Sequence, residues 1–342
     1  MNGEISPRFD GYGFSLTGRS HMGTGTPCQD SHLLVHQYGR WQLVAVADGV
    51  GSAPCSHQGS FAALSALAFR CEPLLIHEDD AGCLDALRAG FAYALDSVKR
   101  LAEEENCPLQ DYDTTLTACL YDGETVFIGH VGDGGIIGMD EKGEYHLLTQ
   151  VQKGEAWNEV CPLRFGEAYW RFERTPVRCA AILLLTDGLL DQAAPSLLFG
   201  QPDPLYRRFI NLFLPADVIS AKSAPSLPES EQTVPRWPCE SRGEPAGDAP
   251  EEDAASPGQA LGARLSALLA QESYRHLTDD LTAAALWWRG IEQQPPEPDY
   301  LKEPDWEALR RERYDKLYPQ LRREEECADA AEEPEGAGEA AQ

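Results

Sequence analysis

The chain has 342 residues, which is enough for one large domain or for two of ordinary size. With 42% apolar and 25% charged residues, its composition is that of a globular protein and excludes a wholly disordered one. The 56 acidic residues outnumber the 28 basic ones, which gives a formal net charge of −28. Because so acidic a surface repels phosphate backbones, sequence-independent nucleic-acid binding is disfavoured, whereas clustered carboxylates could bind divalent cations.

Short apolar runs and helical periodicity alternate between residues 11 and 214. Four runs rich in Val, Ile, Leu and aromatic residues predict strands at Gln42–Ala47, Leu116–Tyr121, Thr125–Val131 and Ala180–Thr186. Apolar residues at three- and four-residue steps predict helices at Ser60–Arg70 and about Ala81–Glu105. Further along, Ala260–Ser273 is predicted as a helix and Leu281–Trp288 as one more strand. This order predicts a mixed α+β domain of stacked layers.

Composition divides the chain into segments. Eight of the 24 prolines fall within residues 215–258, which predicts a flexible insertion in a domain that spans residues 1–290. Residues 291–323 are expected to form a hinge and an amphipathic C-terminal helix around Trp306, which could dock a partner or pack on its own domain. Residues 324–342 hold eight acids and are expected to be a disordered tail.

Cysteine spacing and apolar run length bear on the class and location of the protein. None of the ten cysteines forms a C-x-x-C pair, which argues against a zinc ribbon or a thioredoxin-type site. The first residues lack a basic segment followed by an apolar core, and the longest apolar runs are strand-sized. We therefore expect a reduced cytoplasmic protein that does not bind membranes.

Aspartates stand at the ends of four predicted strands. Asp48, Asp133 and Asp187 each follow a strand and adjoin a glycine, while Asp279 and Asp280 precede the last strand. A single Asp-Gly pair is usually a turn, so a turn and a ligand remain open alternatives for each position. Several carboxylates at one sheet edge would repel one another unless a cation neutralised them, and hard oxygen ligands select Mg²⁺ and Mn²⁺.

Six short motifs resemble, in the same order, those of the metal-dependent PP2C (PPM) protein phosphatases, in particular the divergent bacterial branch. They are Gln29-Asp30, Ala47-Asp48-Gly49-Val50-Gly51, Thr114-Thr115-Leu116, Val131-Gly132-Asp133-Gly134, Leu185-Thr186-Asp187-Gly188 with Asp191, and Asp279-Asp280-Leu281-Thr282. The resemblance runs from about Gly13 to Trp288. It implies a four-layer α-β-β-α sandwich with two central antiparallel sheets and a site for Mn²⁺ or Mg²⁺ at one end.

The resemblance also implies roles for individual residues. Two ions in the core site would be held by Asp48, the carbonyl of Gly49, Asp187 and Asp279, and a third, weaker ion by Asp133. Asp30 would orient the attacking water from outside the metal shell, so the implied catalytic residues are Asp30, Asp48, Asp187 and Asp279. The implied reaction is hydrolysis of phosphoserine or phosphothreonine by a hydroxide that bridges the two ions.

The chain departs from the family pattern where substrate phosphate binds. Many relatives carry an arginine at the position of Gly25 and some a histidine at the position of Val50. Arg19, His21 and His57 are candidate replacements for phosphate binding, although a structural role for His21 is equally open and another role is favoured for His57. His57 begins a predicted helix and is expected to have a helix-start or surface role.

Two functions from different classes remain open on the sequence alone. The leading one is a protein serine/threonine phosphatase that opposes a bacterial protein kinase, with a phosphorylated protein as substrate and a monomer as the expected state. The alternative is a catalytically weak or inactive PP2C-fold module that binds phosphoproteins or a kinase. A phosphatase for small phosphorylated metabolites is a third, less favoured interpretation.

Overall fold

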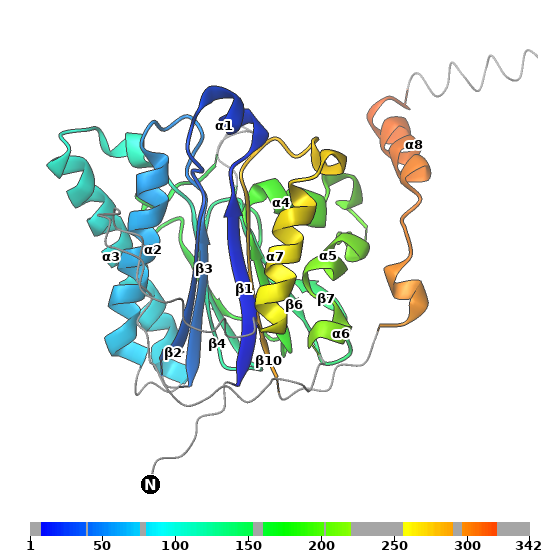
Figure 1. Ribbon diagram of the computed structural model, residues 1–342, viewed down its shortest axis with the longest axis horizontal. Coiled ribbons are helices and arrows are strands. Elements are labelled where there is room, and N and C mark those ends of the chain that lie inside the picture. Colours follow the sequence, from blue (N-terminus) through cyan, green and yellow to red (C-terminus); the bar gives the residue numbers. More distant parts are fainter. Residues whose placement is uncertain are drawn as a thin grey trace, which may run out of the picture.

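The computed structural model describes residues 8–38, 40–75, 80–152, 160–201, 203–219, 256–289 and 296–319. Within these ranges, two five-stranded antiparallel sheets pack face to face (Figure 1). The first sheet has the order β1–β10–β9–β6–β7 and contains β1 (Phe9–Leu16), β6 (Gly135–Met139), β7 (Tyr145–Leu147), β9 (Ala181–Leu185) and β10 (Leu281–Trp288). The second has the order β2–β3–β4–β5–β8 and contains β2 (Ser31–Tyr38), β3 (Trp41–Ala47), β4 (Leu116–Tyr121), β5 (Val126–Val131) and β8 (Arg171–Arg174).

Helices cover the outer face of each sheet. The long helices α2 (Ser56–Leu75) and α3 (Asp80–Glu104) pack on the second sheet. The first sheet is covered by α4 (Asp187–Ala193), α5 (Arg207–Phe213), α6 (Ala216–Ile219) and α7 (Pro257–Leu269). The predicted α-β-β-α sandwich is therefore confirmed, and the central strands are buried on both faces, as their continuous apolar runs require.

Side chains alternate between the outer and inner faces of each strand. In β3, Leu43, Ala45 and Ala47 face the α2–α3 layer, whereas Val44 and Val46 face the other sheet. A third apolar cluster, with Tyr121 and Leu286 among its members, fills the space between the sheets. This cluster fixes how the two sheets stack and hence which strand ends meet.

One edge of the sandwich collects the ends of strands from both sheets. The register pairs Ser31 with Ala47 and Leu116 with Val131 in the second sheet. In the first sheet, Gly135 pairs with Leu185 and Leu16 with Leu281. The loops that follow β3, β5 and β9, and the loop that precedes β10, therefore lie at the same edge, which we call the acidic rim.

Helices lie at both ends of the interval predicted as an insertion. The interval 215–258 begins with helix α6, whose Ile219 is buried in the core, and it ends inside α7, which starts at Pro257. Ser256 caps α7 by accepting the Gln259 backbone N–H at 3.2 Å. Residues 220–255, and the acidic segment 324–342, lie outside the described residues.

The C-terminal part of the chain runs along the first sheet's side of the molecule (Figure 1). The Tyr300 hydroxyl accepts the Tyr145 N–H at 2.5 Å, and the Arg207 guanidinium lies 4.1 Å above the Tyr300 ring. Helix α8 (Trp306–Leu317) follows and has no buried residue. Among the described helices, none has the length and apolar character that a membrane crossing needs.

The remaining described helical elements are short. Helix α1 (Arg19–Thr24) lies at the acidic rim and ends at Gly25, whose φ of +74° is the left-handed conformation that favours glycine. Turns of 3₁₀ helix occur at Leu109–Tyr112, Leu163–Phe165, Ser196–Leu198, Glu272–Tyr274 and Pro298–Leu301.

Candidate metal centre

Three aspartates from three loops converge at the acidic rim. Carboxylate oxygens of Asp48, Asp133 and Asp187 all lie within 4.8 Å of one another, and each of these residues is partly exposed. Asp48 follows β3 of one sheet, whereas Asp133 precedes β6 and Asp187 begins α4 after β9. The site therefore depends on the stacking of both sheets.

The backbone around Asp48 is held by two threonines and a close glycine contact. The Asp48 N–H donates to Thr115 Oγ1 at 2.9 Å, and the Thr114 hydroxyl donates to the Asp48 carbonyl at 3.0 Å. A Cβ at Gly49 would lie 2.7 Å from the Gln29 carbonyl oxygen, so glycine permits this approach. These contacts hold the Asp48 backbone in place at the end of β3.

Asp30 lies beside the three aspartates and is almost completely buried. The Thr186 hydroxyl donates to its Oδ2 at 2.7 Å. Burial raises the pKa of Asp30 to about 8, against the opposing effect of the Thr186 hydrogen bond, and the nearby Asp280 and Asp187 charges raise it further. The outer, water-orienting role of Asp30 remains a prediction.

Burial and the charges of neighbouring carboxylates also raise the pKa values of Asp48 and Asp187. The pKa of Asp48 lies well above its ordinary value because of burial first and then the charges of Asp30, Asp187 and Asp133. Burial raises the pKa of Asp187 in the same way. Carboxylates buried this close together repel one another, so the arrangement is energetically unfavourable without a cation. A set of hard oxygen donors fits Mg²⁺ or Mn²⁺.

Asp279 lies at the border of this group. Its charge raises the pKa of Asp187, so the two carboxylates are close, but Asp279 is exposed and its Oδ1 accepts the Asp280 N–H at 2.8 Å. It is not among the three acids that lie within 4.8 Å of one another. The structure thus groups Asp133 more tightly with Asp48 and Asp187 than it groups Asp279.

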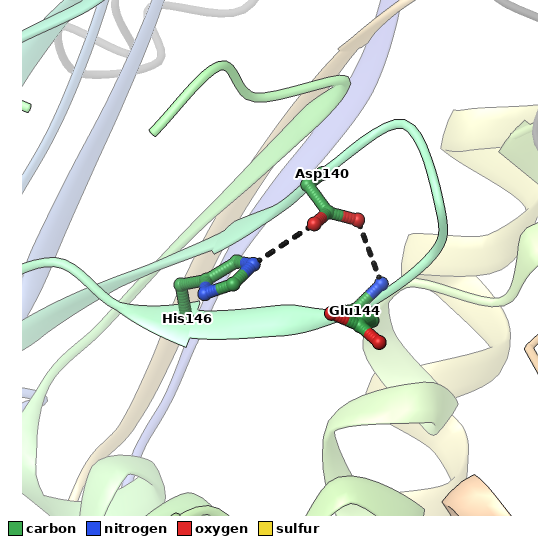
Figure 2. Close-up of side chains that lie close together, drawn as sticks. All are labelled: Asp140, Glu144 and His146. Atoms are coloured by element: carbon green, nitrogen blue, oxygen red, sulfur yellow. Dashed lines mark hydrogen bonds and ion pairs between the residues drawn. The ribbon is translucent and has the colours of Figure 1, made fainter. Parts of the chain in front are cut away.

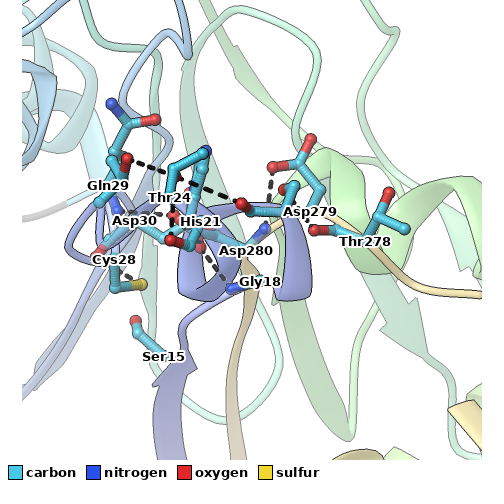
Figure 3. Close-up of polar contacts among 12 residues, drawn as sticks. Ser15, Gly18, His21, Thr24, Cys28, Gln29, Asp30, Thr278, Asp279 and Asp280 are labelled. Carbon is cyan, nitrogen blue, oxygen red and sulfur yellow. Dashed lines mark hydrogen bonds and ion pairs between the residues drawn. The ribbon is translucent and has the colours of Figure 1, made fainter. Parts of the chain in front are cut away.

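Asp280 ties three segments of the acidic rim together (Figure 3). Its Oδ1 accepts the Gly18 N–H at 2.6 Å and lies 2.9 Å from His21 Nδ1, and its Oδ2 accepts the Gln29 N–H at 2.6 Å. Gly18 follows β1, Gln29 precedes β2 and Asp280 precedes β10. The residue is 3% exposed, so it is an internal anchor rather than an open ligand.

The two candidate phosphate-binding residues already have protein partners. His21 is paired with Asp280, and the Arg19 guanidinium donates to Glu272 Oε2 and to the Gln271 carbonyl, both at 3.2 Å. Phosphate binding by either residue remains a prediction. At Gly25, where many relatives have an arginine, the space around an added Cβ is open.

A second group of potential ligands lies away from the acidic rim, on the β6–β7 hairpin. Figure 2 shows Asp140 between His146 and Glu144. Asp140 Oδ1 accepts the backbone N–H groups of Lys142 and Glu144, and Oδ2 lies 3.1 Å from His146 Nε2. Aspartate side chains commonly accept backbone N–H groups in hairpin turns. The cluster of Asp140, Glu144 and His146 is therefore explained without a metal.

Some residues of the site lack a signal in the sequence. Asp280 adjoins Asp279 in the same motif, yet only the fold reveals that it points inward. Ser15, His32 and Thr117 lie on the inner faces of their strands near the acids, and they stand in strand segments with nothing to single them out. Sequence reasoning missed them because facing positions on two sheets are not neighbours in the chain.

The fold and the acids define a class: a helix-covered double-sheet sandwich with carboxylates from several loops at one rim. The model of the family described as protein phosphatase 2C matches residues 17–217. The chain therefore belongs to the protein phosphatase 2C family.

Two solved structures illustrate the similarity. A bacterial serine phosphatase carrying a point substitution is 15% identical with a TM-score of 0.50, over 83% of this chain and 98% of that one. The Mycobacterium tuberculosis serine/threonine phosphatase PstP/Ppp is 17% identical with a TM-score of 0.50, over 82% and 98%. These likenesses concern the fold. No curated protein sequence matches the chain.

Proposed function

We propose that the protein is a Mn²⁺- or Mg²⁺-dependent phosphatase that hydrolyses phosphoserine and phosphothreonine in proteins. The single observation that carries the proposal is the convergence of Asp48, Asp133 and Asp187 within 4.8 Å in a chain of the protein phosphatase 2C family. The raised pKa values of Asp48 and Asp187 indicate a site that is incomplete without a cation.

The proposed roles divide between holding cations and handling water. Asp48, the Gly49 carbonyl, Asp187 and Asp279 would hold two ions, with Asp133 as a ligand for a third or as part of the same group. Bound divalent cations would stabilise charge on the phosphoryl oxygens and acidify water. Asp30 would orient the attacking water through a carboxylate oxygen, since its own geometry is fixed by Thr186.

Hydrolysis of p-nitrophenyl phosphate and of a phosphothreonine peptide tests the proposal. We expect turnover with Mn²⁺, its loss with EDTA, and a fall of at least about a hundredfold in kcat for Asp187→Asn. Asp140→Asn is the matched control, because it alters the other carboxylate group, on the β6–β7 hairpin, and should retain activity. Turnover that survives EDTA, or Asp187→Asn with full activity, would refute the metal-dependent mechanism.

A second candidate function is a phosphoprotein- or kinase-binding module without turnover. The observation that favours it is the pairing of Arg19 with Glu272 and of His21 with Asp280, since both candidate phosphate ligands are engaged. A protein that binds the phosphothreonine peptide unchanged, with or without Mn²⁺, would favour this module over the enzyme.

We infer the biological setting from the proposed activity. A phosphorylated protein would be the substrate and a kinase the opposing activity, in the cytoplasm and with the phosphatase as a monomer. The acidic composition supports protein rather than nucleic-acid partners. A ratio of kcat/KM that favours the peptide over small phosphate esters would separate this role from metabolite hydrolysis.

A further inference from the structure

A polar cavity of about 290 Å³ opens at the side of the sandwich, and we call it the β8 cavity. It is lined by His130 on β5, by residues 149–152, which follow β7, and by residues 171–173 of β8. Strands β7 and β8 are edge strands of the first and the second sheet. The cavity therefore lies where the two sheets end beside one another.

The histidine of the cavity has one ring nitrogen without a partner. His130 is 2% exposed, and its Nδ1 lies 2.9 Å from Oγ1 of Thr117, its cross-strand neighbour on β4. Among the described residues, His130 Nε2 has no hydrogen-bond partner. Burial lowers the pKa of His130 to about 4, so the ring is neutral near pH 7. When Nδ1–H donates to Thr117, Nε2 is an acceptor.

Gln152 supplies a second buried acceptor. Its Oε1 has no hydrogen-bond partner within the described part of the chain. Its backbone N–H donates to the Gly132 carbonyl at 2.9 Å, which holds the residue against the β5–β6 turn. A buried acceptor without a donor is unfavourable, and a water or a ligand removes this penalty. Two such acceptors in one cavity indicate that it receives a group with N–H or O–H donors.

Two opposite charges border the cavity. Arg171 and Glu173 stand two residues apart on β8, and both are exposed. Arg171 Nη1 donates to the Ala168 and Trp170 carbonyls at 3.1 and 3.2 Å, which fixes the guanidinium near the cavity. Because the formal charges of the lining cancel, a charged group would lose its hydration without a net countercharge. An uncharged polar group is therefore favoured.

The β8 cavity shares a wall with the acidic rim. Gly132, which accepts the Gln152 N–H, directly precedes Asp133, one of the three converging acids. Gly132 has a φ of +113°, and a Cβ there would lie 2.5 Å from Thr115 Cβ, so only glycine allows this turn to pack so closely. A group bound in the cavity thus lies behind the turn that carries Asp133.

We propose that the β8 cavity is a binding site for a primary carboxamide. Its NH₂ group has two donors, one for Gln152 Oε1 and one for His130 Nε2, and its carbonyl accepts from the Arg171 guanidinium. The carboxamide can belong to a free molecule or to an asparagine or glutamine side chain of a protein substrate. Only the second case rests on the proposed phosphatase function, and there the cavity would select residues that flank the phosphorylated one.

Nitrogen-15 NMR of the metal-free full chain tests the site, with L-glutamine as the probe and L-glutamate as its isosteric control. We expect His130 to carry its proton on Nδ1 and its Nε2 resonance to shift saturably with glutamine. Glutamate should bind at least about fivefold more weakly, because its carboxylate has no donor for either acceptor. His32, on the opposite edge strand β2 and paired with Ser15 Oγ at 3.0 Å, is the internal control and should not shift.

Two variants locate the binding. Gln152→Leu removes one acceptor at similar side-chain volume and should weaken glutamine binding at least about fivefold. Gln271→Leu is the matched control, because it makes the same change at an exposed residue after α7, and it should bind as the wild type does. Equal affinity for glutamine and glutamate, a His130 proton on Nε2, or undiminished binding by Gln152→Leu overturns the proposal. If Gln152→Leu fails to fold, the wild-type titrations still decide.

Phosphothreonine peptides that carry glutamine, glutamate or alanine at one flanking position identify the source of the carboxamide. If it belongs to the substrate, glutamine at one position should raise kcat/KM at least about fivefold over alanine in the wild type and in Gln271→Leu, but not in Gln152→Leu. A His130 shift with free glutamine and no peptide preference assigns the site to a free molecule.

A cavity that holds water only overturns the proposal. That result would be the absence of both a His130 shift with glutamine and a preference for the glutamine peptide. A wild-type protein without any turnover refutes the proposed function instead. In that case, NMR titrations with glutamine and with the same peptides still decide whether the β8 cavity binds a carboxamide.

Discussion

Removing the Asp280 carboxylate should destabilise the protein more than removing any exposed acid. Its two oxygens accept buried backbone N–H groups from Gly18 and Gln29, both at 2.6 Å, and it also pairs with His21. In Asp280→Ala both N–H groups lose their partner, at a cost of about 1–3 kcal/mol each. We therefore expect a loss of about 3–5 kcal/mol in the free energy of unfolding.

Asp280→Asn separates charge from shape. The amide has one acceptor oxygen, so one of the two backbone N–H groups would face an NH₂ group instead of an oxygen. We expect this variant to lose about 1–3 kcal/mol, less than the alanine variant. Since the Asp280 charge raises the pKa of Asp30, the amide should also lower that pKa.

Urea denaturation of the two variants and of Glu272→Gln provides the measurement. Glu272 is the control because its ion pair with Arg19 is exposed, with side chains 72% and 37% accessible, and such pairs contribute about 0–1 kcal/mol. The midpoint should fall in the order Glu272→Gln, Asp280→Asn, Asp280→Ala at a constant slope. If Asp280→Ala is as stable as Glu272→Gln, Asp280 does not anchor the acidic rim.

Three further outcomes follow from the same structure. In EDTA, stability should fall as pH rises from about 5 to 8, by up to ~1.4 kcal/mol per pH unit, because folded Asp30 keeps its proton until a pKa of about 8 whereas the unfolded residue loses it near its ordinary pKa of 3.8. Calorimetry with and without Mn²⁺ checks this, and Mn²⁺ should flatten the dependence. In EDTA, Asp187→Asn should raise the melting temperature, because it removes the repulsion between Asp187 and its neighbouring carboxylates. The same variant should lose the stabilisation by Mn²⁺, which melting curves or titration calorimetry would measure. Tyr300→Phe should cost about 1 kcal/mol in urea denaturation by unpairing the Tyr145 N–H, whereas Trp306→Ala, in a helix without buried residues, should cost less.

The strands with continuous apolar runs were predictable from the sequence, and so was β5 despite its Gly129, whereas the glycine-containing strands β1 and β6 were not. The predictions for Leu116–Tyr121 and Leu281–Trp288 match β4 and β10. Strand β1 was missed because Gly11 and Gly13 resemble turn residues. In the fold they are sites of close approach, since a Cβ at Gly11 would lie 2.3 Å from the Ala285 carbonyl oxygen.

The acids of the site could be foreseen individually, while their arrangement could not. Each aspartate follows or precedes an apolar run, which marks a strand end in the sequence. Which strand ends meet depends on the register of both sheets and on the apolar cluster between them. For the same reason, nothing in the sequence distinguishes Asp279, which is exposed, from Asp280, which is an internal anchor.

The repulsion among Asp30, Asp48 and Asp187 links folding to cation binding. A cation that binds only the folded chain adds a stabilisation of RT ln(1 + [L]/Kd), which is about 2.7 kcal/mol at a concentration of 100 Kd. The same cation removes the repulsion that raises the three pKa values, so its effect should grow with pH as more carboxylates would otherwise be charged. Backbone anchors such as Asp280 and the threonines next to Asp48 hold the loops without occupying the cation's place. The acidic rim can therefore keep its shape before a cation binds, and the binding energy is not consumed in ordering the loops.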